Sequence, residues 1–175
     1  MILLGRWLVR LVPVAALLAA LAGADAPVSA EPKEEELIRT TSFADLQDTI
    51  KQHKGKVVLI DFWAEFCVPC KKAFPHLVKL HNKLGKDGLV VLSVNVDDPA
   101  DKDAQKDART FFKKQKASFP CLFFKSVKEL DKTSKHYDVD SIPHVVIYDR
   151  QGKVAETDAD VDELEVAVQK LLKKK

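Results

Sequence analysis

The fold of this chain is decided by residues 57–70, which read VVLIDFWAEFCVPC. An almost continuous apolar run over residues 56–63, rich in β-branched side chains, is typical of a central strand buried on both faces. Cys67 and Cys70 follow this run directly, and apolar side chains then recur at helical spacing over residues 74–84. The stretch therefore predicts a strand, a turn that carries a Cys-x-x-Cys pair, and a helix.

The flanking sequence extends this pattern in both directions. Periodicity and β-branched runs predict strands at residues 37–38, 88–96, 120–124 and 145–148, and helices at residues 43–53, 101–116 and 161–171. Gly152 predicts the turn of a closing hairpin, whereas the polar residues 125–137 receive neither a helix nor a strand. Because strands alternate with helices, we expect an α/β fold with a mixed central β-sheet flanked by helices.

The composition limits the class of protein. The 175 residues carry a net charge of only +2, which gives no reason to expect nucleic acid as a partner. Three cysteines are too few for a disulfide scaffold, and 46% hydrophobic residues suit one domain with an ample core.

The N-terminal residues 1–30 have the pattern of an export signal. Two arginines precede an apolar run at residues 11–22, and small residues then favour cleavage before Glu31. A retained membrane anchor through residues 7–24 is the alternative, although this apolar run is shorter than the roughly 20 residues that a spanning helix needs. Either interpretation predicts export, to the periplasm, of a single domain formed by residues 31–175.

The Cys-x-x-Cys pair at the start of the expected helix favours redox chemistry. Unpaired backbone N–H groups at a helix N-terminus stabilise a thiolate, so Cys67 is the expected nucleophile. Cys70 lies one turn later and is near enough to resolve a mixed disulfide. A permanent structural disulfide and a zinc site are the alternatives, but zinc needs four ligands and no second pair at ligand spacing is present. We therefore predict no metal.

Several motifs resemble the thioredoxin family over nearly the whole expected domain. Residues 58–71 resemble the active-site strand and turn, residues 141–143 the cis-proline loop, and residues 149–154 the closing hairpin. The chain is longer than thioredoxin between the strand expected at residues 88–96 and the cis-proline loop. This extra segment, at about residues 98–136, resembles the helix-plus-strand insertion of exported TlpA/ResA-like reductases, with Cys121 on the strand.

Four further residues complete the expected site. Asp61 lies within an apolar strand, so desolvation should raise its pKa and let it take the proton of Cys70, and the resemblance implies the same role. Trp63 is expected to cover the active-site turn, with ordinary core packing as the alternative. The resemblance implies that Pro143 is cis and sits against the disulfide, where the backbone of Ile142 pairs with a substrate strand.

These features predict an exported thiol-disulfide oxidoreductase that reduces protein disulfides without a bound cofactor. The expected partners are a disulfide-containing client protein and an upstream electron donor, membrane-bound or soluble, and a monomer is expected. The subgroup resemblance implies the heme-binding cysteines of apocytochrome c as a client. The alternatives are an oxidase or isomerase of the same fold, a non-catalytic thiolate metal-binding module, and a thiol peroxidase that uses Cys121.

Two residues remain outside this site. Cys121 follows Phe119-Pro120 in a hydrophobic strand, so we expect a buried core thiol. His144 follows the expected cis-proline, and we expect a partly exposed strand residue, with a pH-sensitive group beside the sulfurs as the alternative.

Overall fold

The computed structural model describes residues 37–158 and 163–174 of the chain. Within them the elements are, in order, β1 (Ile38–Thr41), α2 (Phe43–Gln52), β2 (Val57–Trp63), α3 (Val68–Leu84), the short 3-10 helix η1 (Gly85–Asp87), β3 (Leu89–Asn95), α4 (Lys102–Lys114), β4 (Cys121–Phe124), α5 (Val127–Tyr137), β5 (His144–Tyr148), β6 (Val154–Thr157) and α6 (Leu164–Lys173). The expected signal or anchor, residues 1–30, lies outside this part. Among the helices of the described ranges, none has the length and apolarity needed to cross a bilayer.

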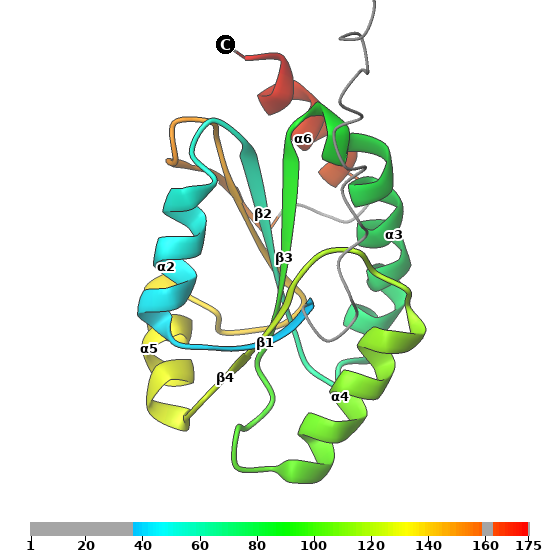
Figure 1. The fold of residues 1–175 in the computed structure, drawn as a ribbon, viewed down its shortest axis with the longest axis vertical. Helices are drawn as coiled ribbons and strands as arrows, with labels where there is room; N and C mark the ends of the chain where they lie inside the picture. The colour runs from blue at the N-terminus through cyan, green and yellow to red at the C-terminus, as the bar shows by residue number, and fades with distance from the viewer. Residues whose placement is uncertain (1–36, 159–162, 175) are drawn as a thin grey trace, which may run out of the picture. The chain divides into compact units, whose positions relative to one another are not determined.

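The six strands form one mixed sheet in the order β1-β4-β3-β2-β5-β6. The first four in this order run parallel, whereas β5 and β6 are antiparallel to their neighbours. Helices α2 and α5 cover one face of the sheet, and α3, α4 and α6 cover the other (Figure 1). The predicted α/β architecture with a mixed central sheet is confirmed.

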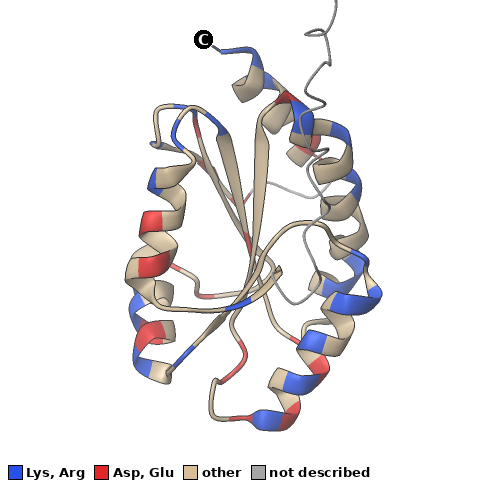
Figure 2. Ribbon diagram, viewed as in Figure 1, with Lys and Arg blue, Asp and Glu red and all other residues tan. Residues whose placement is uncertain are grey.

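The central strand β2 is buried at every position, as its continuous apolar sequence predicts. Its even-numbered side chains pack into the core beneath α2 and α5, and its odd-numbered apolar ones pack beneath α3 and α6. The strands are mostly uncharged, while lysine, arginine and acidic residues follow the outer faces of the helices (Figure 2). In β2 and β3 together the sole ionisable side chain is Asp61.

Helix α5 differs from the sequence prediction, which left residues 125–137 without an element. This helix is very polar, and only Thr133 and Tyr137 are fully buried on it, so its apolar periodicity is weak. Tertiary contacts hold it, because Tyr137 Oη accepts a hydrogen bond from Gln47 Nε2 of α2 at 2.7 Å. Residues 98–136 therefore contain two helices and one strand rather than one of each.

Candidate active site

The two cysteines lie at the N-terminus of α3. Cys67 is the N-cap residue, and its sulfur accepts a hydrogen bond from the Cys70 N–H at 3.2 Å. Pro69 occupies the first turn of the helix, where backbone N–H groups have no acceptor within the helix, so the absence of an N–H on proline costs no hydrogen bond. The two residues are joined by a disulfide and both are almost fully buried. The expected placement of the pair at the start of a helix is confirmed.

Two exposed apolar side chains flank Cys67 in the sequence. Phe66 and Val68, the neighbours of Cys67 in sequence, are 72% and 56% exposed. Large apolar side chains with this exposure are uncommon on one small patch of a soluble surface and mark sites of contact with another molecule. These two side chains therefore present an apolar surface to solvent.

The expected cis-proline loop lies at the same end of the sheet. The peptide bond between Ile142 and Pro143 is cis, as the resemblance implies. Strand β5 begins at His144, which pairs with Phe62 of β2 in an antiparallel register. Because β2 ends one residue later and leads into the cysteine turn, this pairing brings residues 142–143 to the edge where the disulfide lies.

Asp61 is buried on the face of β2 that packs beneath α3. It is only 4% exposed, and its Oδ2 has no hydrogen-bond partner. Burial raises the pKa of this carboxyl from 3.8 to about 7. The desolvation expected from its position in an apolar strand is therefore confirmed, and near neutral pH this group can either bind or release a proton.

Trp63 lies two residues after Asp61 on the same face. Its side chain is fully buried against Phe74 of α3, with ring centroids 5.5 Å apart, and against Phe111 of α4 at 5.3 Å. It supports the helix that carries the cysteines, but a side chain with no exposed surface offers no contact to a client in this form. The observed position matches the core-packing alternative.

Cys121 belongs to the same buried layer as Asp61. The strand register aligns Asp61 of β2, Ser93 of β3 and Cys121 of β4 in one row across the sheet. Ser93 Oγ lies 3.7 Å from Cys121 Sγ, and burial is the main cause that raises the pKa of this thiol to about 12. The prediction of a buried core thiol is confirmed, and a thiol with this pKa supplies almost no thiolate for peroxide chemistry at neutral pH.

The sequence prediction missed Asp97, which anchors the active-site turn. Its Oδ2 accepts hydrogen bonds from the backbone N–H of Glu65 at 2.8 Å and from Asn95 Nδ2 at 2.6 Å. The residue is almost fully buried, which raises its pKa. The available signal was an Asn-x-Asp sequence directly after a buried strand.

His144 also differs from the prediction. It is buried, not partly exposed, because β5 lies between β2 and β6. Its Nδ1 lies 2.6 Å from Asp158 Oδ1, and its ring packs 5.7 Å from that of Phe62. The prediction of a partly exposed residue is therefore wrong.

A family model described as thioredoxin-like matches residues 55–154, which is more than half of the chain. The chain belongs to the thioredoxin-like family. The matched range contains both cysteines, Asp61 and the cis-proline loop.

Individual relatives agree with this assignment. The chain is 30% identical over 101 residues to the thiol-disulfide oxidoreductase ResA of Bacillus subtilis, covering 58% of this chain and 51% of that protein. It spans about half the length of the curated relatives it matches first. Among solved structures, it is similar to a putative thiol:disulfide interchange protein DsbE from Chlorobium tepidum, at 29% identity and a TM-score of 0.59, covering 70% of this chain and 84% of that one. It is also similar to the exposed lipoprotein thioredoxin Etrx1 of Streptococcus pneumoniae, at 26% identity and a TM-score of 0.56, covering 70% and 90%.

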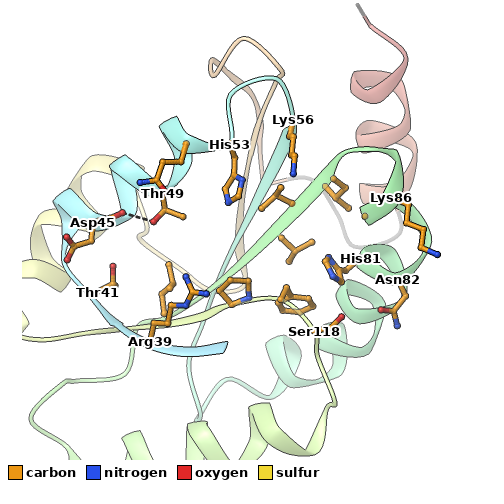
Figure 3. A pocket seen from close by; sticks show the side chains of 18 of the residues that line it. Arg39, Thr41, Asp45, Thr49, His53, Lys56, His81, Asn82, Lys86 and Ser118 are labelled. Carbon is orange, nitrogen blue, oxygen red and sulfur yellow. Dashed lines mark hydrogen bonds between the residues drawn. The ribbon is translucent and has the colours of Figure 1, made fainter. Parts of the chain in front are cut away.

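Two cavities of the thioredoxin-like domain have different relations to this site. One of about 710 Å³ lies at the edge of β3, where β4 pairs only with Ser93–Asn95, and side chains from β1, α2 and α3 surround it (Figure 3). None of the predicted site residues lines it. The other, of about 260 Å³, is lined by Phe66 and Ile142, which directly precede Cys67 and Pro143 in the sequence. Across the described ranges, no group of three or more His, Cys, Asp or Glu side chains is arranged to hold a metal ion.

Proposed function

We propose that this protein is an exported thiol-disulfide oxidoreductase that reduces disulfides in client proteins. One observation carries the proposal: the Cys67–Cys70 pair caps α3 at the edge of the sheet where the cis Ile142–Pro143 bond lies. The similarity to thiol-disulfide oxidoreductases supports the activity. The pattern of residues 1–30 and the name of the pneumococcal relative support export.

The first chemical step belongs to Cys67 in the dithiol form. The N-terminal N–H groups of α3, that of Cys70 among them, stabilise its thiolate. The thiolate attacks one sulfur of the client disulfide, a bond forms between the two proteins, and the client's S–S bond breaks. The departing client sulfur leaves as a thiolate and takes a proton from water.

The second step belongs to Cys70 and Asp61. The Asp61 carboxylate accepts the proton of the Cys70 thiol, and the resulting thiolate attacks the Cys67 sulfur of the mixed disulfide. The protein becomes a disulfide, and the client leaves with both sulfurs reduced, so two electrons have passed to the client. A pKa of about 7 suits Asp61 to this transfer near neutral pH.

The cycle needs a second partner that returns two electrons to the Cys67–Cys70 disulfide. We infer a membrane-bound or soluble dithiol donor, and a client that offers a disulfide, for which the heme-binding cysteines of apocytochrome c are a candidate. The dithiol itself carries the electrons, so the reaction needs no cofactor, and we infer that the protein acts as a monomer.

Insulin reduction and the redox potential test the proposal. We expect reduction of insulin that is lost in Cys67→Ser, and a potential closer to the about −270 mV of thioredoxin than to the about −120 mV of strong disulfide oxidases. We expect Cys70→Ser to accumulate a mixed disulfide through Cys67. A potential near the oxidase value, or insulin reduction that persists in Cys67→Ser, contradicts the reductase assignment.

A further inference from the structure

The cavity of about 260 Å³ that Phe66 and Ile142 line has a distinct composition. Its lining combines five apolar residues, two serines and two aspartates, namely Phe66, Val96, Leu130, Val139, Ile142, Ser134, Ser141, Asp131 and Asp140. We refer to the surface formed by these nine residues as the acidic groove. These residues belong mainly to the active-site turn, to α5 and to the loop that leads to the cis-proline.

The apolar part of the acidic groove is open to a partner. Phe66 directly precedes Cys67 and is 72% exposed, while Ile142 directly precedes the cis-proline and is half-buried. Water-exposed apolar surface at this place is costly for an isolated protein and is relieved when an apolar side chain of a client covers it. A client segment that reaches the disulfide would therefore place one apolar side chain here.

The two carboxylates of the acidic groove have no direct partner among the described residues, although Lys128 and Lys135 lie one turn from Asp131 on α5. Asp131 of α5 and Asp140 of the following loop are both exposed, and neither carboxylate makes a hydrogen bond or ion pair with another residue of the described ranges. No Lys, Arg or His lines this cavity. The nearby Lys71, which follows the cysteine pair, is already paired with Glu65 at 2.8 Å. A client that brings a cation would gain two opposite charges, whereas an acidic client would meet repulsion.

We propose that the acidic groove selects client segments that carry an apolar side chain and a Lys or Arg beside the disulfide. This inference rests on the proposed reductase function and names the substrate class of the same site. Exposed ion pairs are individually weak, so two of them should favour the basic client by about 2- to 30-fold in rate.

Two model peptides test the inference on the full-length protein in its dithiol form. Both contain the same intramolecular disulfide flanked by Leu, and they differ only in a Lys or a Glu beside it. Single-turnover reduction gives a second-order rate constant for each peptide, and reduction by dithiothreitol gives their intrinsic reactivity ratio. We expect the protein to prefer the Lys peptide by about 5-fold over that intrinsic ratio, and high salt to weaken the preference.

Variants of the groove residues, with one matched control, identify the source of the preference. Asp131→Asn and Asp140→Asn should each reduce it, and together they should return the ratio to the dithiothreitol value. Asp107→Asn, an exposed acidic residue on α4, is the matched control and should keep the full preference. Phe66→Ser should slow the reduction of both peptides equally.

The outcomes distinguish failure of the acidic groove as a selector from failure of the proposed reductase function. Equal corrected rates for the two peptides, or a preference that survives in the double variant, would overturn the acidic groove as a selector while leaving the reductase intact. Reduction of neither peptide, together with inactivity on insulin, would overturn the proposed function itself.

Discussion

Replacing Asp61 with asparagine should change how the stability of the oxidised protein depends on pH. In the folded protein burial raises the pKa of Asp61 to about 7, whereas an exposed carboxyl in the unfolded chain titrates near 3.8. Between these two values the folded state holds a proton that the unfolded state has lost. Wild-type stability should therefore fall as the pH rises through this window, and it should level off above the folded pKa.

The size of the effect follows from the shift. A rise of about three pH units at about 1.36 kcal/mol each corresponds to roughly 4 kcal/mol between acid and mildly alkaline solution. Asparagine does not titrate, so Asp61→Asn should lack this loss. Any packing cost of the amide is independent of pH, so the gain of the variant over the wild type should grow by about 4 kcal/mol from about pH 4 to about pH 8.

Urea denaturation of the oxidised protein, without reductant, measures this difference at a series of pH values. Histidines and other carboxylates titrate in both proteins and cancel in the comparison. Asp107→Asn, at an exposed position of α4, should follow the wild-type curve. Parallel curves for wild type and Asp61→Asn would refute the idea that burial of this carboxylate raises its pKa.

Three further predictions follow from the packing around the site. Removal of the Asp97 carboxylate in Asp97→Ala should lower the free energy of unfolding by about 2–3 kcal/mol, because one buried and one partly buried donor lose their acceptor. A loss below about 0.5 kcal/mol in urea titration would contradict this. Cys121 should resist Ellman's reagent in the native oxidised protein and react as one thiol in urea, and rapid native labelling would show that it is not buried. Phe74→Ala should cost about 3–5 kcal/mol, since the ring is fully buried among other aromatic rings, whereas the exposed Phe66→Ala should cost little, so equal losses in thermal denaturation would argue against this packing.

The sequence predicted those parts of the site that depend on local patterns. A carboxylate inside an apolar run is visible in one strand, so burial of Asp61 could be inferred without a structure. The cysteine turn was visible because the pair lies in a short motif between a strand and a helix. The cis-proline was expected only from the resemblance of residues 141–143 to the thioredoxin family, since nothing in the local sequence distinguishes a cis from a trans bond there.

The features that the sequence did not predict depend on contacts between distant segments. The row of Asp61 with Cys121 needs the register of β4 against β3, which no local pattern specifies. Helix α5 was missed because few of its side chains are apolar and a hydrogen bond from α2 holds its buried tyrosine. Because Asp131 lies on α5, the acidic groove could not be predicted from the sequence either.

The N-cap of α3 links the stability of this helix end to the reduction potential of the cysteine pair. The sulfur of Cys67 closes the end of the helix by accepting the Cys70 N–H, and the same atom gains negative charge when the disulfide is reduced. A thermodynamic cycle then connects the two events, because whatever favours the charged cap favours the dithiol by the same free energy. A stronger hydrogen bond to the Cys67 thiolate would stabilise the dithiol form, raise the reduction potential of the pair and make the protein a weaker electron donor. Sequence changes in the first turn of α3 should therefore shift the reduction potential of the pair without altering the reacting sulfur atoms.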